Sequence, residues 1–220
     1  MADEIYNKDA VTVAAVGRIY VAPNETDFSG IDDLKGEDSP WKSLGLFDAE
    51  TGVEHAFEEE TEDIKSWQQG VVRTIVTSRD LTLKFLALET SPRTLELFYG
   101  LETGSIKPGA DGSFTWKVGA SAKRAPFSAV MVLEDGETVI SAYLRSAQVS
   151  EVEAPTFSAA DAIKWGMTIK ALGSNYGDAA TTCDDGSSLV SWKFEKRVCE
   201  PIDPPGPGEN VITGNVRESI

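Results

Sequence analysis

Alternation of apolar and polar residues at every second position is the dominant pattern of this chain, and it predicts half-buried β-strands. The first such run extends from Val11 to Val21 and ends at Pro23. Further runs of the same kind cover residues 81–87, 114–118, 163–171 and 190–194. The repeated period of two indicates a mainly β protein.

One hairpin is expected where the apolar runs 127–133 and 139–145 flank Glu134-Asp135-Gly136-Glu137. Both central residues of a type I′ turn need positive φ, and Asp-Gly is a favoured pair for these positions. We therefore expect an antiparallel hairpin with Asp135 and Gly136 at its turn.

One segment has a clear helix signature, at about residues 92–99. Ser91 can cap the free amides of the first turn, Pro92 suits the first helical position, and Gly100 suits the residue after the end. Leu95 and Phe98 fall on one face at helical spacing. The predicted fold class is mainly β (α+β), an antiparallel β-sandwich or open barrel with this one principal flanking helix.

The stretch 48–63 does not resemble a core segment, because it holds eight acidic residues and no Lys or Arg. We expect a long, mobile, solvated hairpin or loop, an arm of about residues 48–69. Its acids Glu58, Glu60 and Glu62 share one side of a strand and His55 lies nearby. Calcium or zinc sites need more convergent ligands than this pattern supplies, so we expect an exposed histidine and no metal or cofactor.

The sequence also lacks a catalytic constellation. Ser39-Pro40-Trp41-Lys42 fits Ser-x-x-Lys, but this short pattern arises by chance, and its companion motifs are missing. No Gly-x-Ser-x-Gly elbow, phosphate-binding glycine-rich loop or Cys-x-x-Cys is present. The expectation is that the protein is not an enzyme; carboxylates such as Glu58 and Glu62 would be the last-ranked catalytic candidates.

Composition and charge exclude several further classes of function. The 220 residues carry 20 basic and 36 acidic side chains, a net charge of 20 − 36 = −16. Such a chain repels phosphate, which excludes the usual basic groove for nucleic acid. No apolar run is long enough for a membrane span, and the N-terminus lacks a signal peptide, so we expect a cytosolic product with free thiols at Cys183 and Cys199.

One domain followed by a linker and a short tail is expected. Residues 1–200 form the β domain, and the Pro/Gly-rich run 201–208 begins a linker and short tail that ends at residue 220.

The residues next to each tryptophan predict whether it lies in the core or at the edge of a loop. Trp116, Trp165 and Trp192 lie on apolar strand faces and are expected in the core. Trp41 and Trp67 lie at the edges of polar loops, where an aromatic side chain either anchors a protein interface or folds back on its own sheet.

Several segments together resemble the major tail (tail tube) proteins of long-tailed bacteriophages, in particular those that infect actinobacteria. They are Val13 to Pro23, Trp41 through Leu44-Gly45 to Gly52-Val53, Ile64 to Trp67-Gln68, the helix Ser91 to Gly100, and Asp161 to Trp165. The resemblance spans roughly residues 5–200 and leaves the run after Pro201 unexplained.

This resemblance implies a structural virion protein whose β-sandwich subunits form six-membered rings that stack into a tube for genome passage. It implies self-association, contacts with other tail proteins (tape measure, terminator and tip), and DNA that passes without specific binding. The family and the charge pattern together assign subunit contacts to Trp41, Phe57, Trp67 and Gln68. The alternative is an acidic β-sandwich binding module, such as a capsid decoration or surface-recognition domain, which would stay monomeric or form a small closed oligomer.

Overall fold

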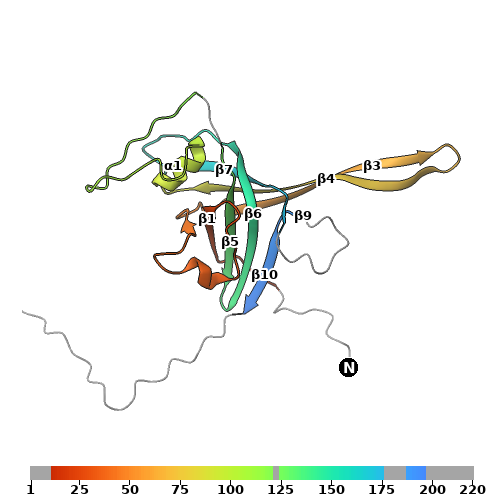
Figure 1. The fold of residues 1–220 in the computed structure, drawn as a ribbon, viewed down its shortest axis with the longest axis horizontal. Helices are drawn as coiled ribbons and strands as arrows, with labels where there is room; N and C mark the ends of the chain where they lie inside the picture. Colours follow the sequence, from red (N-terminus) through yellow and green to blue (C-terminus); the bar gives the residue numbers. More distant parts are fainter. Residues whose placement is uncertain (1–10, 121–123, 176–186, 197–220) are drawn as a thin grey trace, which may run out of the picture.

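The computed structural model describes residues 11–120, 124–175 and 187–196 (Figure 1). Its elements in chain order are β1 (Val16–Pro23), the 3-10 helix η2 (Ile31–Leu34), β2 (Lys42–Ser43), β3 (Val53–Ser66), β4 (Gly70–Ala87), α1 (Pro92–Tyr99), β5 (Phe127–Asp135), β6 (Thr138–Val152), β7 (Trp165–Ala171), β8 (Ser174–Asn175), β9 (Ser187–Ser188) and β10 (Ser191–Lys196).

The main sheet is antiparallel and branches at β6. Its strands follow the order β2-β1-β5-β6-β7-β4-β3, and β10 also pairs with β6. One side of β6 pairs with β5, while the other side pairs with β10 over residues 138–143 and with β7 over residues 147–152. The expectation of a mainly antiparallel β fold with one α-helix is confirmed.

The central strand β5 is buried on both faces. Ala129 and Met131 lie in the larger cluster, which also contains α1 residues, and Val130 and Val132 lie in a second cluster. Burial on both faces explains why β5 reads as a continuous apolar run instead of an alternating one.

Helix α1 has the bounds and caps that the sequence predicts. The Ser91 hydroxyl accepts a hydrogen bond from the Thr94 amide at 3.2 Å, and Gly100 ends the helix in the left-handed conformation with φ 64°. Leu95 and Phe98 face the larger core cluster. Local capping and one apolar stripe therefore fix this helix on the sheet.

The hairpin of β5 and β6 forms as expected, but the predicted turn type is wrong. Asp135 pairs with Thr138, so the two central turn residues are Gly136 and Glu137. Gly136 has φ 57° and Glu137 has negative φ. Glycine at the first central position is typical of a type II′ turn, which needs positive φ only there.

Two predicted strand segments are wrong in extent. The first strand begins at Val16, while Val11 and Val13 are exposed. Residues 114–118 form no strand and belong to a loop whose aromatic side chains reach α1: the ring centroids of Trp116 and Tyr99 are 6.5 Å apart.

The tryptophan predictions are corrected in three places. Trp165 is buried as expected, but Trp116 and Trp192 are 39% and 48% exposed. Trp41 is only 3% exposed and packs against Phe28 and Tyr143 within the second cluster. It therefore belongs to the packing of its own subunit and is not available as an exposed anchor.

Some predictions fall outside the described residues. These are the state of Cys183 and Cys199 and the linker and tail of residues 201–220.

The cap of α1 generates a first test. Replacing Ser91 with alanine removes the side-chain acceptor of the Thr94 amide, and we expect a loss of about 1 kcal/mol in the free energy of unfolding, measured by urea denaturation. Ser105→Ala is the control, because Ser105 is exposed and helps no helix cap. Equal stability of the Ser91→Ala variant and the parent would contradict this account of the helix start.

Candidate functional site

The most prominent feature of the molecule is a two-stranded arm that projects from the sheet (Figure 1). All of β3 pairs with residues 70–85 of β4, but β4 pairs with β7 only over residues 82–87. We use the term arm for residues 54–81, where each strand has only the other as its paired neighbour within the described chain. Twelve residues of β4, Gly70 to Leu81, extend about 40 Å at about 3.3 Å per residue.

The return strand of the arm was not predicted. The sequence analysis placed the arm at residues 48–69 and began the next strand at Leu81. A signal was present in the β-branched run Val71-Val72-Arg73-Thr74-Ile75-Val76-Thr77. The alternation of apolar and polar residues is interrupted in this run. Val72 and Thr77 lie at register shifts, where β4 has one residue without a partner in β3.

The root of the arm is fastened by a turn around Asp48. The Gly52 amide donates to the Asp48 carbonyl, and Gly52 has φ 58°. Lys164 pairs with the Asp48 carboxylate at 2.7 Å, and Thr51 donates to it from its hydroxyl at 2.9 Å. These hydrogen bonds lower the pKa of the Asp48 carboxyl and join the arm's root to the start of β7.

One face of the arm engages its acids across the two strands. Glu59 forms an ion pair with Arg79 at 2.8 Å. Nearer the tip, Asp63 accepts a hydrogen bond from the Thr74 hydroxyl at 2.7 Å. These contacts hold both carboxylates in place, and the ion pair also balances the charge of Glu59.

The opposite face carries Glu54, Glu58, Glu60 and Glu62 at alternate positions of β3, and we call it the acidic face. Ser78 donates to Glu60 at 3.0 Å. Within the described part of the chain, Glu58 and Glu62 form no ion pair. All four carboxylates are exposed. Glu54 lies opposite Lys84, whereas Glu58, Glu60 and Glu62 follow one another on the same face and repel each other in a lone subunit.

Apolar side chains are also exposed along the arm. Trp67 at the tip is fully exposed, and the turn beneath it is held by Ser66, whose hydroxyl accepts from the amides of Gln68 and Gln69. Other large apolar residues that are about half exposed are Phe57, Ile64, Val71, Val72 and Val76. An exposed apolar surface of this kind, bordered by charges, is typical of a protein interaction site.

At the root, the arm borders an open groove together with the segment before β10. Phe57 and Val76 line it from the arm, and Trp192 lines it from β10. His55 is exposed, as predicted, and its ring lies 5.5 Å from that of Trp192. The structure thus brings Phe57 to the arm's root and Trp67 and Gln68 to its tip, while Trp41 lies elsewhere in the fold.

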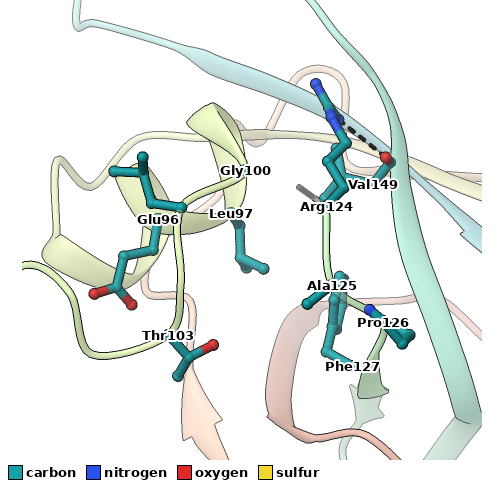
Figure 2. A pocket seen from close by; sticks show the side chains of 10 residues that line it. Glu96, Leu97, Gly100, Thr103, Arg124, Ala125, Pro126, Phe127 and Val149 are labelled. Atoms are coloured by element: carbon teal, nitrogen blue, oxygen red, sulfur yellow. Dashed lines mark hydrogen bonds between the residues drawn. The ribbon is translucent and has the colours of Figure 1, made fainter. Parts of the chain in front are cut away.

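A second, small pocket lies between α1 and the segment that leads into β5 (Figure 2). The buried Glu96 carboxylate accepts a hydrogen bond from the Ile106 amide at 2.9 Å, and Arg124 donates to the Val149 carbonyl at 3.0 Å. Both charged groups therefore hold loops in place. Among the described residues, no group of three His, Cys, Asp or Glu could hold a metal ion.

No helix in the described ranges is long and apolar enough to cross a membrane.

Comparison with known proteins identifies a family that matches most of the chain. Residues 5–188 match the family described as phage tail tube protein. The chain is 30% identical over 160 residues to major tail protein Gp23 of Mycobacterium phage D29, which covers 67% of this chain and 77% of that protein. Gp23 of Mycobacterium phage L5 is 31% identical with the same coverage. Among solved structures, the anti-feeding prophage tube-terminating cap matches 89% of this chain and 100% of its own, with a TM-score of 0.45 and 11% identity.

The family match confirms the resemblance inferred from the strand, turn and helix segments. The chain belongs to the phage tail tube protein family, as a structural component of the virion and not an enzyme.

Proposed function

We propose that copies of this chain form six-membered rings that stack into a hollow tail tube, with the arm as the contact between neighbouring subunits. The ring symmetry is the one implied by the family. The observation that carries the proposal is the arm itself: a two-stranded ribbon with a fully exposed Trp67 at its tip. A ribbon of two strands is at best marginally stable in water, so a partner surface would stabilise it.

The proposed contact residues are Phe57, Trp67 and Gln68. Phe57 is 51% exposed at the arm's root, and Trp67 is fully exposed at the tip beside Gln68. A large aromatic side chain that becomes buried at the centre of an interface is the usual hot spot of binding. Trp41 is left out of this set because its ring is already packed inside the subunit.

The charge of the chain supports a channel that passes DNA without binding it. Six copies at −16 place 6 × (−16) = −96 formal charges in each ring. A wall of the same sign as phosphate removes the attraction that would hold the genome in place. The same charge keeps free subunits soluble and apart before assembly.

The remaining partners follow from the position of such a tube in the virion. We infer contacts with other tail proteins at the two ends of the tube and with a tape-measure protein inside it. The alternative of a free-standing binding module lacks support from any feature beyond the exposed aromatic side chains, which the tube proposal also uses.

The assembly state is the first test of this proposal. Electron microscopy of the concentrated protein should show rings or tubes. Raising salt from about 0.1 M to about 1 M shortens the Debye length from about 10 Å to about 3 Å, so charge-dependent assembly should shift with ionic strength. A protein that stays monomeric or forms only a small closed oligomer at every concentration and salt level would contradict the proposal.

Truncating Trp67 tests the arm. Trp67→Ala should weaken assembly by about 2 kcal/mol per interface if the side chain is a hot spot, and thermal unfolding of the monomer should be unchanged. Trp41→Ala is the matched comparison, since it should lower the stability of the monomer by about 3–5 kcal/mol. Early melting of the Trp67→Ala monomer, with normal tube formation by the folded fraction, would assign Trp67 to the subunit core.

A further inference from the structure

The loop between α1 and β5 has the opposite charge to the rest of the chain. Residues 100–126 contain four basic residues and two acidic residues, a net charge of 4 − 2 = +2 in a chain of net charge −16. Of the two acidic residues, Asp111 accepts hydrogen bonds from the amide and hydroxyl of Ser113. These bonds lower the pKa of Asp111, so its carboxylate is ionised and already engaged within the loop.

Two lysines of this loop are available to a partner. Lys107 and Lys117 are exposed, and neither forms an ion pair with any residue in the described ranges. They flank a tight turn in which the Gly109 amide donates to the Ser113 carbonyl at 2.7 Å. This turn doubles the chain back, so the two ammonium groups belong to adjoining limbs of one loop.

The same loop is anchored to the fold at its inner end. The Ile106 amide donates to the buried Glu96 carboxylate of α1 (Figure 2 shows this carboxylate), and Ile106 itself is buried. The Trp116 ring lies 6.0 Å from that of Phe114, yet Trp116 is 39% exposed and Val118 is 54% exposed. The lysines therefore stand beside an exposed apolar surface on an anchored loop.

The arm carries the complementary surface. Its acidic face presents the unpaired carboxylates Glu58 and Glu62, followed toward the tip by the exposed Ile64 and Trp67. Charges of opposite sign next to apolar side chains on both surfaces are the pattern of complementary protein interfaces.

The arm and the loop lie at opposite ends of the molecule's longest axis (Figure 1). One subunit cannot bring its own arm to its own loop, so any contact between them joins two copies. A contact between two different surfaces of identical subunits is heterologous, and it propagates as a ring or an open filament.

We propose that the loop of residues 103–118 receives the acidic face of the arm of a neighbouring copy, with Lys107 and Lys117 pairing with Glu58 and Glu62. This inference rests on the proposed function, because it names the surface that the arm meets during self-association. The exposed Trp116 and Val118 supply the apolar part of the receiving surface for Ile64 and Trp67.

Charge reversal on each side tests the pairing. Lys107→Glu/Lys117→Glu gives an acidic loop, and Glu58→Lys/Glu62→Lys gives a basic arm. Each double variant alone should raise the protein concentration needed for tube formation, measured by sedimentation and electron microscopy, about tenfold or more. The chain that carries all four substitutions should assemble as the parent does, because its charges are complementary again.

Mixing the two double variants is the most direct test of the pairing. Each supplies the surface that the other lacks, so an equimolar mixture should form tubes at a concentration where neither does alone. Lys42→Glu/Lys196→Glu is the control for the loop variant, with the same change in net charge at two exposed lysines outside the loop, and it should assemble at the parent's concentration. Thermal unfolding of the loop and arm variants should match the parent, since Lys107, Lys117, Glu58 and Glu62 are all exposed.

The results separate this inference from the proposed function. Tubes formed by the parent and by both double variants at the same concentration, a mixture that fails to recover, or an equal loss in the control would each overturn the pairing while leaving the tube proposal intact. A parent protein that forms no tubes would overturn both.

Discussion

A ribbon of two strands without a sheet or core beneath it depends on what lies against it. From Leu81 toward the tip, the β3–β4 arm has its own cross-strand hydrogen bonds and, at its root, an ion pair of Asp80 with Lys170 of β7 at 2.8 Å. Its other side chains contribute exposed apolar area and a row of like charges. Such a ribbon gains little from burial, so a second surface is the interaction that would hold it in one conformation. The rest of the subunit provides a fixed base from which this arm projects.

The base has a core of its own, to which the arm contributes Leu81 at its root. Strand β5 is buried on both faces, α1 covers one side of the sheet, and the second cluster around Trp41 covers the other. The turn at Asp48 and the pairing of β4 with β7 transmit that rigidity to the arm's root. A folded subunit with an unpartnered arm at one end and a basic loop at the other is suited to head-to-tail association.

The features that the sequence predicted correctly are those that depend on a few neighbouring residues. Ser91 and Gly100 mark the ends of α1, and the two apolar runs around Gly136 identify their hairpin, because capping and turn chemistry act over a few residues. The return strand of the arm was missed, since both its faces meet solvent and its register shifts interrupt the period of two. The burial of Trp41 was also beyond sequence patterns, because its partner Tyr143 comes from a strand a hundred residues away.

The central claim is that the arm becomes ordered by contact with another copy, and amide hydrogen exchange tests it most directly. Exchange is measured for residues 54–81 in the free subunit and in the assembled tube, with the amides of β5 as the internal reference. The account predicts that arm amides exchange quickly in the free subunit and become strongly protected in the tube, while β5 is protected in both. Equal exchange of the arm in the two states would contradict it.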